Sequence, residues 1–233
     1  MPLFTLIAET LRHEITTGQY PPGAKLPTEA ALAERFSVNR HTVRHALQAL
    51  ADAGLVYARR GSGVFVQARP MDYPLGRRVR FHQNISASGK TPSRRITRVE
   101  TLPVNAEDMG ALSLSKGETV HVVEGVSLAD GQPVAAFRSV FPAARFPDFP
   151  DALAARGSIT QALADCGLTD YTRAQTRLTA LLADPLLALT LHVAAQSAVL
   201  QSVAVNVDTA GLPVEYGTTW FAGDRVTLTV NLD

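Results

Sequence analysis

The chain has 233 residues, of which 46% are hydrophobic and 18% are charged, so it is long enough for two domains with buried cores. No run approaches the roughly 18 apolar residues that a membrane helix needs. Glu9 and Glu14 lie where a secretion signal would be basic and then apolar. We therefore expect a cytoplasmic protein with no membrane partner. Cys166 is the only cysteine, so no intrachain disulfide is predicted. No Cys or His cluster has metal-ligand spacing, so no metal is predicted, and no other cofactor is expected.

The formal net charge of +1 hides an asymmetry along the chain. Residues 1–100 hold 15 Lys and Arg against 7 Asp and Glu, a net charge of +8, whereas residues 101–233 hold 7 against 14, a net charge of −7. A basic half suits an anionic polymer such as nucleic acid, and an acidic half avoids it. The first half is therefore the part expected to approach nucleic acid.

The first 54 residues have the pattern of three helices, because apolar residues recur at three- and four-residue intervals. The expected segments are a helix over residues 3–17, a Pro- and Gly-rich loop over 19–27, a helix over 29–36 and a helix over 39–54. Thr28 and Asn39 are suitable N-caps for the second and third helices. The tight turn Ser37-Val38 joins these two helices, and so short a connection is typical of a helix-turn-helix motif.

The third helix has two different surfaces. Its core face is predicted from apolar residues at helical spacing, which are Val43, Ala46, Leu47 and Leu50. Its first turns hold basic and polar residues, which are Arg40, His41, Thr42 and Arg44. A DNA recognition helix carries its base-reading groups near its N-terminus, where the helix dipole also suits phosphate. We therefore predict that the second group contacts DNA.

Residues 55–66 contain two short strand-like runs around a Gly-Ser-Gly turn, which predicts a β-hairpin wing. Arg59 and Arg60 lie beside Gly61, which lets the backbone approach a phosphate closely or lower a side chain into the minor groove. The following residues are rich in proline and arginine and lack a helical stripe, so they are expected to form a linker. The predicted division is a DNA-binding domain at 1–68, a linker at 69–79 and a second domain at 80–233.

The second domain alternates strand-like runs with short helical pieces. A helix is expected over residues 81–88, and further helices over 105–111, 158–164 and 184–191. The strand-like runs are 95–102, 119–128, 134–141, 172–182, 199–208, 213–221 and 226–232. Asp130-Gly131 and Ala210-Gly211 are typical of hairpin turns. The pattern predicts an α+β domain around a mainly antiparallel sheet.

Several residue spacings in the first domain occur together. They are Leu26-Pro27-x-Glu29, Val38-x-Arg40-x-Thr42-Val43-Arg44, Gly54-Leu55 and Arg59-Arg60-Gly61-x-Gly63. Together they resemble the winged helix-turn-helix domain of the GntR family of bacterial transcription regulators. The resemblance implies a homodimer on palindromic operator DNA, with Arg40, Thr42 and Arg44 in the major groove and Gly61 in the minor groove. Some members have arginine where this chain has Ala30, so that contact is either missing or supplied by Lys25.

The second domain resembles the effector-binding domain of the histidine-utilisation-repressor subfamily, whose sheet is similar to that of chorismate lyase. Arg69-Pro-x-Asp72-Tyr-Pro-Leu75, Arg80-Phe-x-Gln-Asn84 and Glu215-Tyr216 resemble the phosphonate-utilisation branch of that subfamily. The resemblance implies a repressor that senses a small anionic metabolite linked to phosphonate or phosphate metabolism. A sugar phosphate or an amino-acid breakdown product is the alternative effector.

Subfamily members place ligand-binding groups on the strands that follow the two hairpin turns. The first-rank positions in this chain are Arg138, Ser139, Glu215 and Tyr216, and the second-rank positions are Arg78, Arg80, His82 and Ser86. Guanidinium groups and hydroxyls suit an anion, whereas a carboxylate suits an amine or hydroxyl of the ligand. Sugar-phosphate-sensing relatives carry arginines where this chain has Gly125 and Ser127, so an anion site must be built differently here. Arg138 could equally be an ordinary exposed strand residue.

An enzyme with chorismate-lyase-like chemistry and an interaction module with a non-sensing second domain are the competing classes. The sequence has no nucleophile elbow, phosphate loop, paired carboxylates at helical spacing or metal-ligand set. No catalytic residue is therefore assigned, and the protein is not expected to be an enzyme.

Overall fold

The computed structural model describes residues 2–59, 61–67, 70–78 and 81–230. The chain divides into two compact units, residues 1–69 and residues 70–233. Among the described residues, no helix has both the length and the apolar character that a membrane crossing requires.

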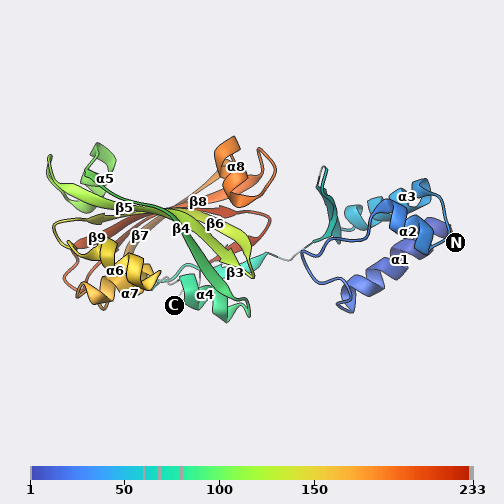
Figure 1. Ribbon diagram of the computed structural model, residues 1–233, viewed down its shortest axis with the longest axis horizontal. Coiled ribbons are helices and arrows are strands. Elements are labelled where there is room, and N and C mark those ends of the chain that lie inside the picture. Colours follow the sequence, from blue (N-terminus) through green and yellow to red (C-terminus); the bar gives the residue numbers. More distant parts are fainter. Residues whose placement is uncertain (1, 60, 68–69, 79–80, 231–233) are drawn as a thin grey trace. The chain divides into compact units, whose positions relative to one another are not determined.

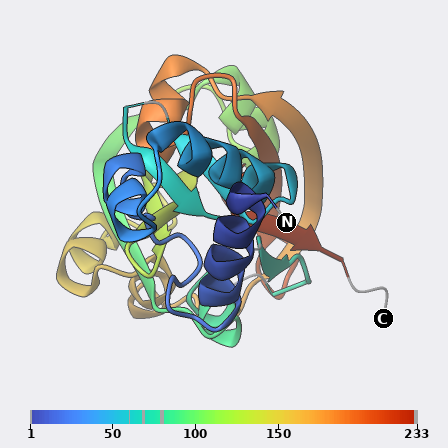
Figure 2. The same cartoon turned by 90° about the vertical axis from the view of Figure 1, so that its right-hand side faces the viewer.

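The first unit is a three-helix bundle with a β-hairpin (Figures 1 and 2). Its elements are α1 (Leu3–Thr16), α2 (Glu29–Arg35), α3 (Arg40–Asp52), β1 (Val56–Arg59) and β2 (Gly63–Val66). The side chain of Thr28 accepts a hydrogen bond from Ala31 N at 3.2 Å, and that of Asn39 accepts one from Thr42 N at 2.8 Å. The predicted caps, the helix-turn-helix and the antiparallel wing hairpin are confirmed.

The helical stripes meet in one core, where Leu11, Leu32, Val43 and Leu50 have no exposed surface. An ion pair between Arg35 and the buried Glu14 ties α2 to α1. The loop before α2 is more ordered than its Pro and Gly content indicated. It runs beside the wing, since Leu26 N donates to Val64 O at 2.8 Å.

The second unit contains a six-stranded antiparallel sheet with the strand order β4-β5-β6-β9-β8-β7. The strands are β4 (Pro92–Pro103), β5 (Thr119–Ala129), β6 (Gln132–Pro142), β7 (Thr172–Leu182), β8 (Ala198–Val207) and β9 (Pro213–Ala222). The helices are α4 (Phe81–Ala87), α5 (Ala106–Leu112), α6 (Phe149–Arg156), α7 (Ile159–Asp165) and α8 (Pro185–Leu191). In Figure 1, α5 and α8 lie on one face of the sheet, and α4, α6 and α7 lie on the other. The expected α+β domain with a mainly antiparallel sheet is confirmed.

One prediction for this unit was wrong, and one helix was missed. Residues 71–74 were assigned to the linker, but they form β3 (Met71–Pro74), which pairs in parallel with β10 (Val226–Thr229) as a separate two-stranded sheet. Met71 and Tyr73 are buried in a core with Phe81 and other residues, whereas Asp72 is exposed. This alternation spans only four residues, and its partner strand lies about 150 residues further on, so local sequence gave no signal. Helix α6 was not predicted.

Candidate DNA-binding and effector-binding sites

The predicted recognition residues lie together in the first turns of α3. Arg40, His41 and Arg44 are exposed and Thr42 is partly buried. The Arg44 guanidinium donates two hydrogen bonds to the Glu29 carboxylate of α2, from Nε to Oε1 at 3.2 Å and from Nη2 to Oε2 at 2.8 Å. This hydrogen bonding lowers the pKa of the Glu29 carboxyl. Glu29 therefore holds Arg44 in place on the exposed surface of α3.

The tip of the wing requires glycine. Gly61 has a φ of +72° and Gly63 a φ of +114°, which is the left-handed region that side chains disfavour. Lys25 forms an isolated β-bridge with Phe65. A Cβ added at Gly63 would lie 2.8 Å from Lys25 Cε, so this side chain crosses the wing at that glycine.

Two arginines of the wing were also predicted to contact DNA. The Arg59 guanidinium carbon lies 5.7 Å from the centre of the Phe65 ring. Arg60 lies outside the described residues.

The second unit has a cavity of about 500 Å³ on the face of the sheet covered by α4, α6 and α7. Polar and charged residues from many elements line it, among them His82 of α4, Arg94 of β4, Ser139 of β6, Arg173 of β7, Asn206 of β8 and Glu215 of β9. We call it the effector cavity. Tyr73 of β3 and residues 156–161, at the junction of α6 and α7, complete the lining.

Arg94 is the most unusual group in the effector cavity, and the sequence analysis missed it. Its guanidinium carbon lies 5.1 Å from the centre of the Phe81 ring and 4.6 Å from that of Phe137. Its Nε is buried and has no hydrogen-bond partner among the residues that the structure describes. Burial lowers the pKa of the Arg94 guanidinium, because a desolvated charge is unfavourable. A cavity-lining cation with a buried, unpaired Nε is a candidate anion-binding group.

Gly125 creates the space for this arrangement. A Cβ at Gly125 would lie 2.4 Å from the backbone oxygen of Arg95 and 2.8 Å from Cζ of Phe137. Only glycine therefore lets the Phe137 ring lie against β5, where it contacts Arg94. Arg94 pairs directly across from Ser127, so β4 supplies an arginine on the same face where β5 has serine.

Glu215 carries the cavity's carboxylate. Its Oε2 accepts a hydrogen bond from Asn206 Nδ2 at 2.7 Å, and Asn206 Oδ1 in turn accepts one from Arg173 Nε at 3.4 Å. No hydrogen bond to Glu215 Oε1 is formed within the described part of the chain. A Cβ at Gly217 would lie 3.6 Å from Glu215 Oε1 and 3.8 Å from Ser139 Oγ, so these two oxygens border the same small space.

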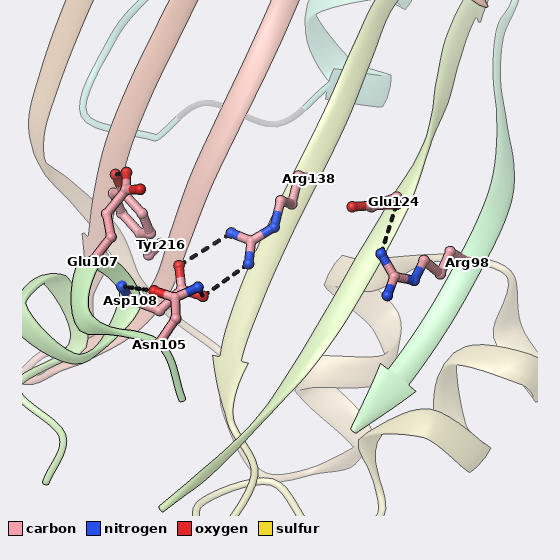
Figure 3. Close-up of polar contacts among 7 residues, drawn as sticks. All are labelled: Arg98, Asn105, Glu107, Asp108, Glu124, Arg138 and Tyr216. Atoms are coloured by element: carbon pink, nitrogen blue, oxygen red, sulfur yellow. Dashed lines mark hydrogen bonds and ion pairs between the residues drawn. The ribbon is translucent and has the colours of Figure 1, made fainter. Parts of the chain in front are cut away.

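Two of the four first-rank effector positions lie on the opposite face of the sheet. Arg138 donates to the carboxylate of Asp108, at 3.1 and 2.8 Å (Figure 3). Asp108 is only 1% exposed. Tyr216 donates to Glu107 Oε1 at 2.5 Å, and burial together with this bond raises the pKa of Tyr216 to about 12. Neither Arg138 nor Tyr216 lines the effector cavity.

The second-rank effector positions are also divided. His82 lines the cavity, and burial and the nearby Arg94 lower the pKa of its imidazole. Ser86 is exposed on α4 outside the cavity, and Arg78 forms an ion pair with Asp170 at 2.6 Å. Arg80 lies outside the described residues. The structure thus brings Ser139, Glu215 and His82 together, and it adds Arg94, Arg173 and Asn206.

Two family models match the chain: bacterial regulatory proteins of the gntR family over residues 5–66, and the UTRA domain over residues 87–227. An HTH-type transcriptional regulator of Rhizobium meliloti (strain 1021) is 37% identical over 229 residues, which are 98% of this chain and 94% of that protein. A protein of Escherichia coli (strain K12) named as a probable transcriptional regulator, PhnF, is 39% identical over 128 residues, 52% of this chain and 53% of its own.

Among solved structures, PhnF from Mycobacterium smegmatis superposes with a TM-score of 0.67 at 26% identity, over 97% of this chain and 98% of that one. The chain is therefore a transcriptional regulator with a helix-turn-helix unit and a UTRA unit. It belongs to the gntR family of bacterial regulatory proteins.

Proposed function

We propose that the protein is a homodimeric repressor that binds a palindromic operator through its first unit and releases it when a small anionic metabolite binds in the effector cavity. The observation that carries the sensing role is Arg94, which lines the cavity and whose buried Nε has no hydrogen-bond partner among the described residues. Desolvating a charge without compensation is costly, so its retention favours a ligand that completes the site.

On the operator, Arg40 and Arg44 are the proposed readers of guanine edges, because a guanidinium can donate two hydrogen bonds to O6 and N7. Arg44 would exchange the Glu29 carboxylate for the base, and Glu29 would hold it ready until then. Thr42, whose hydroxyl lies 3.0 Å from Asn39 Oδ1, would contact a phosphate or a thymine methyl. Lys25 and Gly61 would place the wing against the backbone and in the minor groove.

The proposed effector is a phosphonate or a phosphate-bearing metabolite, with a sugar phosphate as the alternative. Arg94 and Arg173 would hold the anionic group, since guanidinium groups bind tetrahedral oxyanions through paired hydrogen bonds. Tyr73 lies in β3, the first strand of the second unit, and also lines the cavity. A ligand would thereby act on the segment that leads back to the DNA-binding unit and shift the population of operator-competent dimers.

Fluorescence anisotropy of the full chain on labelled duplex from its own promoter region tests the proposal. Binding should weaken steeply as salt increases, because phosphate contacts release counterions. Arg40→Ala should cost about 1 to 3 kcal/mol of binding free energy on the specific duplex. Arg12→Ala, which removes an exposed arginine from α1, is the matched control. A panel of phosphonates, inorganic phosphate and sugar phosphates should include a compound that releases the duplex; a panel without effect contradicts the sensing role.

A further inference from the structure

We infer that the effector is a short zwitterion, with an oxyanion that binds Arg94 and a protonated amine that binds Glu215. The inference rests on the proposed effector cavity and specifies the chemical class of its ligand. It follows from the way the charges of the cavity are paired.

Among the described residues that line the cavity, three are arginines, and only one of them forms an ion pair with a carboxylate. Arg156 is paired with Asp165, with Nε–Oδ2 at 2.7 Å. Within the part of the chain that the structure describes, Arg173 bonds the neutral amide of Asn206, and Arg94 lies against two aromatic rings and forms no ion pair. Glu215 acts on Arg94 only as a nearby charge. Two guanidinium groups are therefore available to one anion.

Glu215 is the carboxylate that these arginines leave unpaired. Asn206 Nδ2 occupies its Oε2, and Oε1 faces the space beside Ser139. A ligand with only anionic groups would place negative charge against this oxygen. A ligand ammonium would instead form a charge-assisted hydrogen bond with it, and Ser139 Oγ could accept a second one.

Strand β6 gives the scale of the ligand. The Arg94 guanidinium lies over the ring of Phe137, whereas Glu215 Oε1 and Ser139 Oγ lie 3.6 and 3.8 Å from the position that a Cβ at Gly217 would take. Phe137 and Ser139 are two residues apart on one face of β6, a step of roughly 7 Å. The cationic and anionic groups of the ligand must therefore be joined by a chain of only a few atoms.

Isothermal titration of the full chain with matched compounds tests this class. The probes are 2-aminoethylphosphonate, its amine-free counterpart ethylphosphonate, and 2-aminoethyl phosphate, which separates a phosphonate from a phosphate ester. We expect both amino compounds to bind at least on the order of tenfold more tightly than ethylphosphonate, because a charge-assisted hydrogen bond is gained. The tighter of the two identifies the anionic group.

Glu215→Gln is the diagnostic variant, because glutamine can still accept from Asn206 but carries no charge. It should lose the tenfold preference for the amine, and its affinity for ethylphosphonate should be at or above the native value, because the negative charge of Glu215 no longer opposes the anion. Glu107→Gln, which removes a carboxylate from the opposite face of the sheet, is the matched control and should keep the preference.

Equal affinity of the native protein for ethylphosphonate and its amino counterpart would overturn the inference, as would a preference that survives in Glu215→Gln. Binding of none of the three probes would also overturn it. In that case, operator release by another anion from the panel would leave the proposed function intact, so the two failures are distinguishable.

Discussion

Arg138 and Ser139 are consecutive in β6, and Glu215 and Tyr216 are consecutive in β9, yet each pair is divided between two faces of the sheet. On the face that α5 covers, these polar groups bond to one another: Arg138 binds the buried Asp108, and Tyr216 binds Glu107. We call it the closed face. On the cavity face, Arg94 lacks a hydrogen-bonding partner at Nε among the described residues. Polar groups that are fully paired within the protein stabilise its fold, whereas an unpaired polar group at a cavity is available to bind a ligand.

The largest expected effect is on the closed face. Arg138→Met should lower the free energy of unfolding by about 3 kcal/mol, because it leaves the Asp108 carboxylate buried without its cation. Chemical denaturation of the full chain, followed in the unfolding step of the second unit, measures the loss. Ligand affinity of the folded variant should stay at the native value. A large loss of affinity in a stably folded variant would place Arg138 in the binding site and break the comparison.

The next prediction concerns Arg94, where we expect a loss of ligand affinity with little loss of stability. Arg94→Met should reduce the affinity for an anionic effector on the order of tenfold to a hundredfold, since a charged hydrogen-bond donor is lost. The free energy of unfolding should stay within about 1 kcal/mol of the native value, because a desolvated charge and its ring contacts are removed together. Titration and denaturation of the same preparation give both numbers. An Arg94→Met variant that loses stability but keeps the native affinity for the effector would show that Arg94 stabilises the fold and does not bind the ligand.

The smallest effect sharpens the comparison at a single hydroxyl. Tyr216→Phe should lower the free energy of unfolding by about 1 kcal/mol, because it removes one hydrogen bond and leaves Glu107 with one partner fewer. Effector-dependent release of operator DNA should be unchanged in an anisotropy assay. Altered release would mean that the closed face also takes part in sensing.

Most of the fold could be predicted from sequence because its signals are local. The caps Thr28 and Asn39 and the turn at Asp130-Gly131 act within a few residues, and the structure confirms each, with Asp130 and Gly131 both at positive φ. Strand β3 could not be predicted in this way, because its partner is distant in the chain and its own pattern is four residues long.

The cavity was only half predictable, for a physical reason. Motif resemblance locates strands but not their faces, so it grouped Arg138 with Ser139 although alternate side chains of a strand point in opposite directions. Arg94 was missed because the expected strand began one residue later. In the structure Arg94 and Ile96 are both partly buried between exposed neighbours, but the sequence shows no such alternation, because Arg94 and Arg95 are the same residue type. Arg94 of β4 is the partner of Ser127 in β5. An arginine that β5 lacks at this place is therefore present on the neighbouring strand.

The parallel pairing of β3 with β10 has a consequence for how the protein is made. The helix-turn-helix unit lies wholly within the first 69 residues and can fold while the rest is still being translated. Strand β3 must wait until residues 226–229 have left the ribosome. The pairing of β3 with β10 is therefore among the last steps in the folding of the second unit, after the helix-turn-helix unit has been made.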